Sequence, residues 1–327
     1  MTLNRRFTQA LKQVVYLFLL LFLVSFITFI LVHYAGSDQI FERLGKNATQ
    51  EELTQLQISM GHTDAVLGQY FAYVNRVIHL GPGTSDMTGQ PVVSILWVAF
   101  LTSLIVVLPG IVLGQMIAVC MALVAIRYQG RRADQLISAL SMFVMSISFV
   151  IAIIFMQMIF SSSDGLDLLP VTGWSTNSFA DYMTHVTLPT MIIVFTNMGY
   201  NLRFARSILE NEAFKPYVTY ARVYGINEFS LLIKNVLPNC ALTIATRFLY
   251  GLPGTFIATS LLIENYFSIP GLGKLIFEAI LFSDIPVLIP VITVSALFFV
   301  LVRNMLNSWL NRLDPRVSRP GGTSQVL

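Results

Sequence analysis

An all-α polytopic membrane protein with six transmembrane helices is the fold class that three features of the sequence predict. The 327 residues are 55% hydrophobic and only 11% charged, with a mean hydropathy of +0.71, whereas soluble domains carry about 25% charged residues. Several apolar stretches reach the roughly 20 residues that a helix needs to cross a bilayer. Lysine and arginine gather at alternating ends of these stretches. The expected spans are residues 14–32, 95–126, 136–160, 186–208, 236–263 and 285–310.

The first span, 14–33 with its flank, follows a cytoplasmic N-terminus of residues 1–13. Its apolar run is longer than the core of a signal peptide, and no small-residue cleavage site follows it, so we expect it to be retained. An extracytoplasmic loop then covers residues 34–94. Within it Thr49 followed by Glu52 is a capping-box pattern, which predicts a short helix near residues 48–61.

Five further spans form the predicted core, residues 95–310, and a cytoplasmic tail covers residues 311–327. Pro109-Gly110 predicts a tilt, a kink or a protruding end in the second span. The outer connections, 161–185 and 264–284, keep apolar residues beside glycine and proline. Both are expected to be re-entrant or surface-packed, because irregular backbone at membrane depth needs cover from protein or a water-filled cavity.

The distribution of basic residues predicts the orientation, because cytoplasmic segments are enriched in lysine and arginine. One side carries Arg5, Arg6, Lys12, Arg127, Arg131, Arg132, Arg203, Arg206, Lys215, Arg222, Lys234, Arg303, Arg312, Arg316 and Arg319. The opposite side carries only Arg43, Lys46, Arg76 and Lys274. Both termini are therefore expected in the cytoplasm, together with the connection between the fourth and fifth spans, residues 209–235.

Motifs for catalysis or nucleotide binding are missing from the sequence. The GLGK run at 271–274 lacks the first glycine and the hydroxyl residue of a phosphate-binding loop. The four histidines are scattered near outer span ends, which favours interfacial placement over a metal site. No serine-nucleophile motif occurs. We therefore expect no catalytic residue, no metal and no cofactor bound by this chain, and no nucleic-acid partner.

Arg247 is the one charge that stands out inside a predicted span. An arginine at a helix centre costs roughly 2.5–3.5 kcal/mol on insertion scales, so it should face a cavity, a partner or a carbonyl. Two interpretations remain open: a pathway-lining group that meets an anionic part of a substrate, or a packing arginine held by a neighbouring helix. Gly251 and Pro253, a turn or two later, suit a span that lines a pathway.

The cytoplasmic connection contains a short polar helix pattern. Tyr217, Tyr220 and Tyr224 recur at helical spacing, with Ala221 expected on the same face. The helix should begin near Pro216 and end at a glycine, Gly225, in the C′ position. Exposed aromatic residues commonly anchor protein interfaces; the alternative is an amphipathic helix that lies on lipid.

This segment, YVTYARVYGINEFSLLIKNVLPN, resembles the cytoplasmic loop of ABC-importer permeases, whose signature runs E-A-A, three residues, glycine, nine residues and I-x-L-P. Here Ala221, Gly225 and the VLP ending match, while the leading glutamate is replaced. GPGTSDMTGQPV, LLPVTGW, the PGLG segment near 270–273 and the ending RLDPRV are similar to the dipeptide/oligopeptide/nickel branch. These similar segments occur in the same order as in the family, from about residue 65 to the end of the sequence.

The resemblance implies a type I ABC-importer permease fold in the bacterial inner membrane, embedded in lipid. Such a subunit pairs with a sister permease, usually as a heterodimer, and works with two cytoplasmic ATPases and an extracytoplasmic substrate-binding protein; ATP is bound by the partners. The 212–238 loop would couple to an ATPase. Matching the family motif to this sequence implies that the docking residues are Tyr217, Tyr220, Ala221, Arg222, Tyr224 and Gly225, with Leu237 and Pro238 as a hinge. The expected outer gate or binding-protein contact comprises Phe267, Pro270, Gly271 and Gly273.

The expected function is ATP-driven import of di- or oligopeptides through a pathway of which this chain forms half. Antimicrobial peptides, polyamines, nickel chelates or another small solute are alternative substrates for the same fold. A self-sufficient channel or secondary transporter is an alternative of a different class, which predicts internal repeats or paired broken helices with ionisable residues at mid-membrane. An intramembrane enzyme needs paired catalytic groups within the spans. The sequence shows neither a repeat nor such a constellation.

Overall fold

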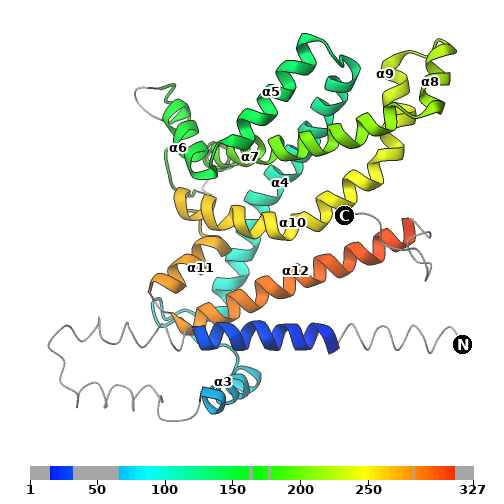
Figure 1. Ribbon diagram of the computed structural model, residues 1–327. Helices are drawn as coiled ribbons and strands as arrows, with labels where there is room; N and C mark the ends of the chain where they lie inside the picture. Colours follow the sequence, from blue (N-terminus) through cyan, green and yellow to red (C-terminus); the bar gives the residue numbers. More distant parts are fainter. Residues whose placement is uncertain (1–14, 32–65, 162–164, 176–177, 283, 314–327) are drawn as a thin grey trace, which may run out of the picture. The chain divides into compact units, whose positions relative to one another are not determined.

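The computed structural model describes residues 15–31, 66–161, 165–175, 178–282 and 284–313, and across these residues it contains helices and no β-strand (Figure 1). The first helix is Val15–Leu31. It is followed by α3 (Val66–Leu80), α4 (Val92–Arg127), α5 (Arg132–Ser146), α6 (Phe149–Phe160), α7 (Phe179–Ala213), α8 (Pro216–Val223), α9 (Glu228–Leu231), the π-helix η1 (Leu232–Val236), α10 (Leu237–Phe267), α11 (Leu272–Leu281) and α12 (Ile285–Leu313). The helix expected near residues 48–61 lies outside the described residues.

The chain divides into two compact units. The first unit comprises Met1–Phe100 and Lys274–Leu301, and the second comprises Leu101–Gly273 and Val302–Leu327.

Among the described residues, three helices are long and apolar enough to cross a membrane: α4, the continuous helix Glu228–Phe267, and α12 over Ile285–Leu306. The helix Val15–Leu31 is apolar but shorter. α7 is 35 residues long and less apolar than α4. Each predicted span has a helical counterpart, but the count of six membrane crossings stays a prediction.

The third predicted span, 136–160, is not one straight helix. It consists of α5 and α6, which meet at an angle of 108°. Ile147 and Ser148 have extended backbone between them, and the hydroxyl of Ser146 donates to the carbonyl of Met142. The expectation of a single helix was wrong. Ser146 and Ser148 are the two polar residues in the run 142–156, and they are a weak stop signal, although such side chains compete for backbone hydrogen bonds.

Aromatic packing joins the helix Val15–Leu31 to α3 within the first unit. Tyr70 is 1% exposed, and its ring meets those of Phe22, Phe26 and Phe29 at centroid distances of 5.5, 5.1 and 5.5 Å. Its hydroxyl lies 2.7 Å from that of Ser25. Edge-on pairs of this kind add to the stabilisation that burial provides, so Tyr70 is a central contact between the two helices, next to the ring pair of Phe29 and Tyr73.

A carboxylate fixes the start of α12 in the same unit. Asp284, 4% exposed, accepts hydrogen bonds from the hydroxyl of Ser85 at 2.5 Å and from the amides of Asp86 and Met87 at 3.3 and 3.4 Å. Residues 82–91 form a compact turn closed by a bridge between Thr84 and Pro91. Ser85 and Asp284, 199 positions apart in the sequence, are therefore in direct contact.

The core of the second unit lies along α7, which contacts both α5 and α10 (Figure 1). Close helix approach requires small residues at two positions. A Cβ on Gly199 would lie 2.9 Å from Cγ1 of Val144, and one on Gly110 would lie 2.9 Å from Cβ of Ile193. The buried cluster continues through Leu202, Leu209 and Val218 into the connection between α7 and α10, so this polar connection is anchored in the apolar core.

Candidate functional site

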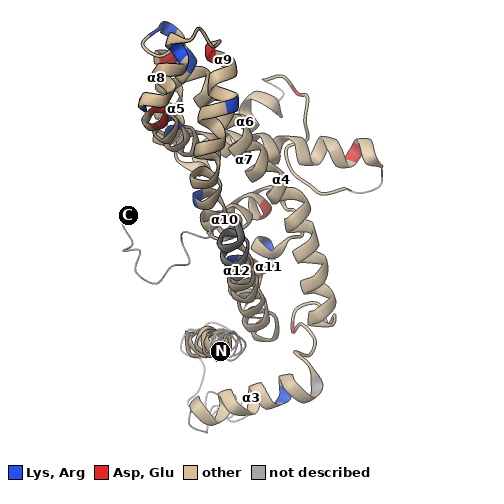
Figure 2. Ribbon diagram, turned by 90° about the vertical axis from the view of Figure 1, so that its right-hand side faces the viewer, with Lys and Arg blue, Asp and Glu red and all other residues tan. Residues whose placement is uncertain are grey.

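The candidate site is the segment 212–238, which we call the docking segment, at the polar end of the second unit. Figure 2 shows the coloured charged residues gathered around α5, α8 and α9, whereas long stretches of the other helices are uncharged. The segment consists of the end of α7, all of α8 and α9, and η1. α8 is therefore an ordered helix outside the apolar stretches, whereas α9 and η1 begin the long apolar helix Glu228–Phe267.

The boundaries of α8 confirm the sequence prediction. The helix starts at Pro216, where the missing N–H is harmless, and Gly225 follows it with φ +77°. The amide of Ile226 donates to the carbonyl of Ala221 at 3.3 Å and that of Gly225 to Arg222 at 3.0 Å. This pair of hydrogen bonds is a Schellman motif, which favours glycine because its C′ residue is left-handed.

A polar network fastens the start of α8 to two other helices. Glu212, at the end of α7, pairs with Lys215 at 2.7 Å and accepts a hydrogen bond from the Tyr217 hydroxyl at 2.9 Å. The amide of Asn239, on α10, donates to the same hydroxyl at 3.0 Å. Tyr217 therefore connects α7, α8 and α10.

Burial opposes the ionisation of Glu212, but hydrogen bonds from Lys215 and Tyr217 and the charge of Lys215 outweigh it and lower the pKa of the carboxyl. Burial is the main cause that raises the pKa of Tyr217; the hydrogen bond to Glu212 adds to it, and the one from Asn239 opposes it. At neutral pH the network is a carboxylate, an ammonium and a neutral phenol.

A second fastening closes the turn between α8 and α9. Arg222 binds both carboxylate oxygens of Glu228, through Nη2 at 2.8 Å and Nε at 3.1 Å, and the hydrogen bond to Glu228 raises the pKa of the guanidinium. The side chain of Asn227 caps α9 by accepting from the amide of Phe229 at 3.1 Å. Bidentate pairs of this type are stronger and more directional than single hydrogen bonds, so the turn has a defined shape.

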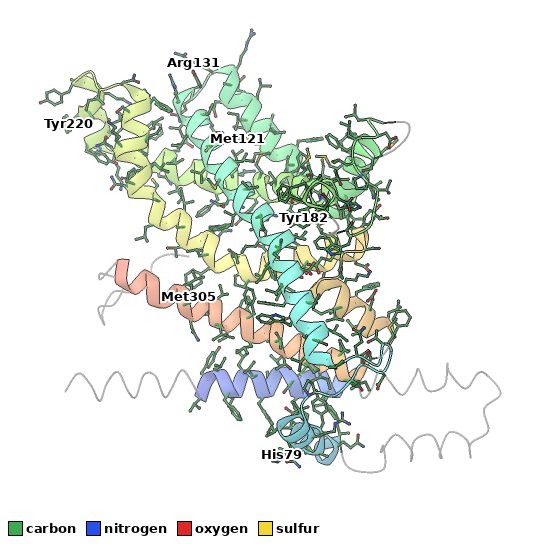
Figure 3. All side chains as sticks on the ribbon, turned by 180° about the vertical axis from the view of Figure 1, so that it is seen from behind. His79, Met121, Arg131, Tyr182, Tyr220 and Met305 are labelled. Atoms are coloured by element: carbon green, nitrogen blue, oxygen red, sulfur yellow. The ribbon has the colours of Figure 1, made fainter. Side chains whose placement is uncertain are left out.

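The two faces of α8 differ sharply in exposure. Val218 is fully buried, and the half-buried Ala221 packs against the core cluster. Tyr220, Val223 and Tyr224 are 66%, 80% and 85% exposed. In Figure 3 the side chain of Tyr220 points away from the unit. The outer face therefore presents an apolar and aromatic surface of three residues.

The expectation of one shared face for all three tyrosines and Ala221 was wrong. Tyr217 turns its hydroxyl toward α7 and α10, and Ala221 faces the chain's own core. Helical spacing alone placed these residues together, but the buried side of α8 is set by Val218 and Ala221, three residues apart. Arg222 is likewise engaged within the segment, by Glu228.

At the expected hinge, the helix is continuous rather than broken. η1 leads directly into α10, and the amide of Leu237 bonds to the carbonyl of Leu232, five residues earlier. Pro238 has no N–H and its ring crowds the carbonyl four residues before it. A wider π-turn ahead of the proline relieves that crowding, and π-turns frequently occur at functional sites.

The three candidate pathway residues do not share one environment. The guanidinium carbon of Arg247 lies 4.7 Å from the ring centre of Tyr200 and 4.5 Å from that of Phe204, both on α7. This double cation–π contact matches the packing interpretation, in which a neighbouring helix holds the charge. Gly251 is exposed, whereas Pro253 is buried within the unbroken α10.

The expected outer gate is mostly buried. Phe267 is 2% exposed, Gly271 and Gly273 are buried, and only Pro270 is exposed. The glycines make room for Glu264, which is fully buried on α10. Its Oε2 accepts from the amide of Gly273 at 2.8 Å, and a Cβ on Gly273 would overlap the backbone of Ser260 and Leu261.

Sequence reasoning missed two buried carboxylates in the second unit. Glu264 is one, and its position four residues before the segment Ser268-Ile269-Pro270-Gly271 was the available signal. Asp134 is the other: it is 6% exposed and pairs with Arg206 of α7 at 2.9 Å. Asp134 and Arg206 are 72 positions apart, so their pairing could not be read from spacing, whereas Glu264 is held by the amide of Gly273, nine positions away.

The fold and the docking segment define a class of protein: a helical membrane protein that carries an ordered short helix, α8, with an exposed apolar face outside its long apolar helices. Residues 110–319 match the model of the family described as the inner membrane component of binding-protein-dependent transport systems, and residues 6–117 match that of the N-terminal part of such membrane components. The chain belongs to this family, as its motifs predicted. Its members are transport subunits of the bacterial inner membrane.

Curated relatives match the chain over nearly its whole length. The metal-staphylopine import system permease protein of Staphylococcus aureus (strain NCTC 8325 / PS 47) is 27% identical over 95% of this chain and 98% of its own. A dipeptide transport system permease protein of Lactococcus lactis subsp. cremoris is 28% identical over 94% and 98%. A glutathione transport system permease protein of Escherichia coli (strain K12) is 24% identical over 91% and 94%.

Proposed function

We propose that this chain is the permease subunit of an ATP-driven importer, that it forms half of the translocation pathway, and that the docking segment receives a cytoplasmic ATPase. The observation that supports the proposal is the outer face of α8. Tyr220, Val223 and Tyr224 are exposed on a helix that is fastened at both ends by Glu212 and Glu228. Exposed aromatic side chains on a rigid element are the usual anchors of protein interfaces.

The proposal extends to the arrangement in the membrane and to the partners. Six spans with cytoplasmic termini would place α8 on the side where ATPases lie. The partners would be a sister permease, two ATPases and an extracytoplasmic binding protein. ATP would bind to the ATPases alone.

The proposed substrate is a di- or oligopeptide. The relatives named for dipeptide and glutathione transport support a short peptide, while the relative named for metal-staphylopine import makes a metal chelate the main alternative. Loading the associated binding protein with labelled dipeptides, glutathione or metal chelates, and measuring uptake into proteoliposomes of the assembled complex, distinguishes these substrates.

A charge on the outer face of α8 tests the docking proposal. Val223→Glu introduces a carboxylate at an 80% exposed position, so the permease should fold normally but lose affinity for the ATPase and lose ATP-driven uptake. The matched control is Gln135→Glu, an exposed residue in the first turn of α5, where the same charge should leave both unchanged. ATPase binding is measured on purified permease pairs in nanodiscs. Undiminished binding by the Val223→Glu variant would exclude docking through this face.

A further inference from the structure

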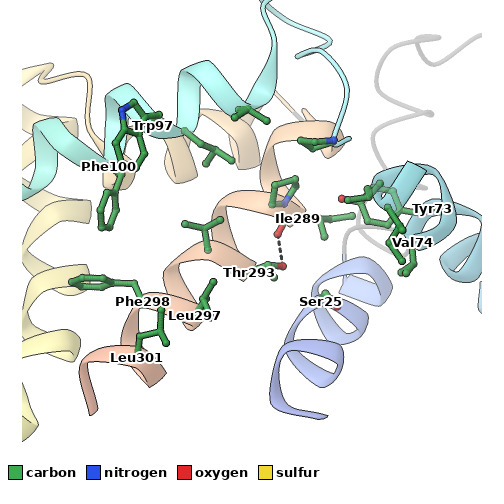
Figure 4. A pocket seen from close by; sticks show the side chains of 17 residues that line it. Ser25, Tyr73, Val74, Trp97, Phe100, Ile289, Thr293, Leu297, Phe298 and Leu301 are labelled. Atoms are coloured by element: carbon green, nitrogen blue, oxygen red, sulfur yellow. Dashed lines mark hydrogen bonds between the residues drawn. The ribbon is translucent and has the colours of Figure 1, made fainter. Parts of the chain in front are cut away.

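The first unit contains an apolar cavity of about 750 Å³ that the transport proposal does not use. Its walls come from the helix Val15–Leu31, α3, α4 and α12. Figure 4 shows Trp97 and Phe100 of α4 along one wall, Thr293 and Leu297 of α12 along another, and Tyr73 of α3 at one end. The rim is open to the surroundings, since Trp97 is 63% exposed and Ile78, also in the lining, is 73% exposed.

Two hydroxyl groups in the wall already have partners within the protein. The hydroxyl of Thr293 donates to the carbonyl of Ile289 at 2.7 Å, and that of Ser25 bonds with Tyr70 at 2.7 Å. Burial raises the pKa of Tyr73 to about 12, against the opposing charge of Arg76, so its phenol stays neutral. The cavity therefore suits an apolar occupant, and water would gain few hydrogen bonds in it.

Positive charge lies at the α3 end of the cavity. The guanidinium carbon of Arg76 is 5.9 Å from the ring centre of Tyr73. The sequence of α3 contains no aspartate or glutamate, and within the described part of the chain no carboxylate lies within ion-pair distance of Arg76. A tyrosine and an arginine at one end of an apolar slot match the arrangement of groups at a membrane–water interface.

The size of the cavity separates two kinds of apolar occupant. A helix about 10 Å in diameter takes up roughly 400 Å³ per turn, so the cavity holds less than two turns and would leave most of a spanning helix of a second subunit outside it. A lipid chain is as apolar as leucine, is narrow, and brings a phosphate at one end. Only the lipid uses both the apolar walls and the charge of Arg76.

We propose that this cavity holds an acyl chain of an anionic phospholipid, with the lipid phosphate beside Arg76. The chain lies against Trp97, Phe100 and the α12 wall. The site is separate from the docking segment and does not depend on the proposed substrate.

Photolabelling of the assembled transporter in nanodiscs tests the site. The probes are phosphatidylglycerol and phosphatidylcholine that carry a diazirine on one acyl chain, and adducts are mapped by mass spectrometry after proteolysis. We expect phosphatidylglycerol adducts concentrated on residues 93–100 and 289–301. Val294→Trp fills the cavity with a larger side chain and should reduce these adducts at least about tenfold. Ile105→Trp, at an exposed position of α4 outside the lining, should leave them unchanged.

Arg76→Gln provides a second measurement that does not alter the packing of the cavity. It should lower phosphatidylglycerol labelling about fivefold, the factor expected for one basic side chain at an anionic lipid surface, and leave phosphatidylcholine labelling unchanged. Adducts spread evenly over all exposed apolar faces, Ile105 included, would indicate bulk lipid and overturn the proposal. Crosslinks from the cavity wall to a sister permease, or equal losses with both lipids in Arg76→Gln, would overturn it as well.

Discussion

Replacing Gly225 with alanine tests whether backbone geometry, rather than side-chain contact, shapes the docking segment. Gly225 has φ +77°, and no heavy atom outside its neighbours lies within 4 Å of where a Cβ would be. The substitution therefore adds strain without a clash. A left-handed conformation costs an L-residue about 1–2 kcal/mol, and the reduced freedom of the unfolded chain returns about 0.4–1 kcal/mol. The net cost is about 1 kcal/mol, which raises the population of the open turn about fivefold.

Hydrogen exchange of the intact permease in nanodiscs measures this opening. The amides of residues 225 and 226, which form the Schellman pair, should exchange about fivefold faster in Gly225→Ala. Gly225→Asn should show a smaller increase, because asparagine tolerates the left-handed region better. Gly130→Ala is the matched control, because Gly130 has φ +76° and equally open space. This substitution should speed hydrogen exchange in the turn at Gly130 and leave the exchange of α8 unchanged. Unchanged exchange in Gly225→Ala, or equal effects of alanine and asparagine, would refute the reasoning.

Three further substitutions test other parts of the second unit. The pKa of Glu212 is lowered below its ordinary value of 4.5, so its contribution to the stability of α8 is present at neutral pH and is lost as pH falls through that lowered pKa. In Glu212→Gln, hydrogen exchange of α8 should be faster at pH 7 and should lose this pH dependence. A preserved pH dependence would assign it to another group. Gly273→Ala should reduce the yield of folded permease in size-exclusion chromatography, because the new Cβ meets backbone, whereas Gly254→Ala, with open space, should not; equal yields would contradict the close packing. Arg247→Met should lower the midpoint of thermal unfolding, because about 0.5–1 kcal/mol of cation–π contact is lost. Substrate preference in uptake assays should stay the same. An altered substrate preference would favour the pathway interpretation.

Apolar length made the positions of the helices predictable from the sequence. A long apolar run such as that of α4, Val92–Arg127, must form a helix in a bilayer, because only a helix satisfies its backbone hydrogen bonds within one segment. The break between α5 and α6 was not predictable, because Ser146 and Ser148 interrupt the apolar run without proline, glycine or charge. The local signal was weak, and a bend of 108° could not be read from it.

The docking segment was predictable where local rules decide and not where long-range contacts decide. Pro216 and Gly225 mark the ends of α8 because each fixes a backbone conformation. The direction of Tyr217 depends on Asn239, 22 residues away, and that of Ala221 depends on which side of α8 meets the core. Which face of a helix is exposed depends on the elements that pack against it, and the spacing of residues in the sequence does not identify those elements.

The contacts of α8 determine how a displacement of this helix would be transmitted to the rest of the second unit. Tyr217 ties the start of the helix to both α7 and α10, and Arg222 ties its end to α9, which continues through η1 into α10. A displacement of α8 is therefore not taken up by a loose loop, because both of its ends are held by charged or hydrogen-bonded pairs. The π-turn before Pro238 and the missing N–H of Pro253 are two points at which the helix Glu228–Phe267 departs from regular α-helical hydrogen bonding. The π-turn lies between α8 and Pro253 in the chain, so a displacement of α8 would reach the turn before Pro238 first.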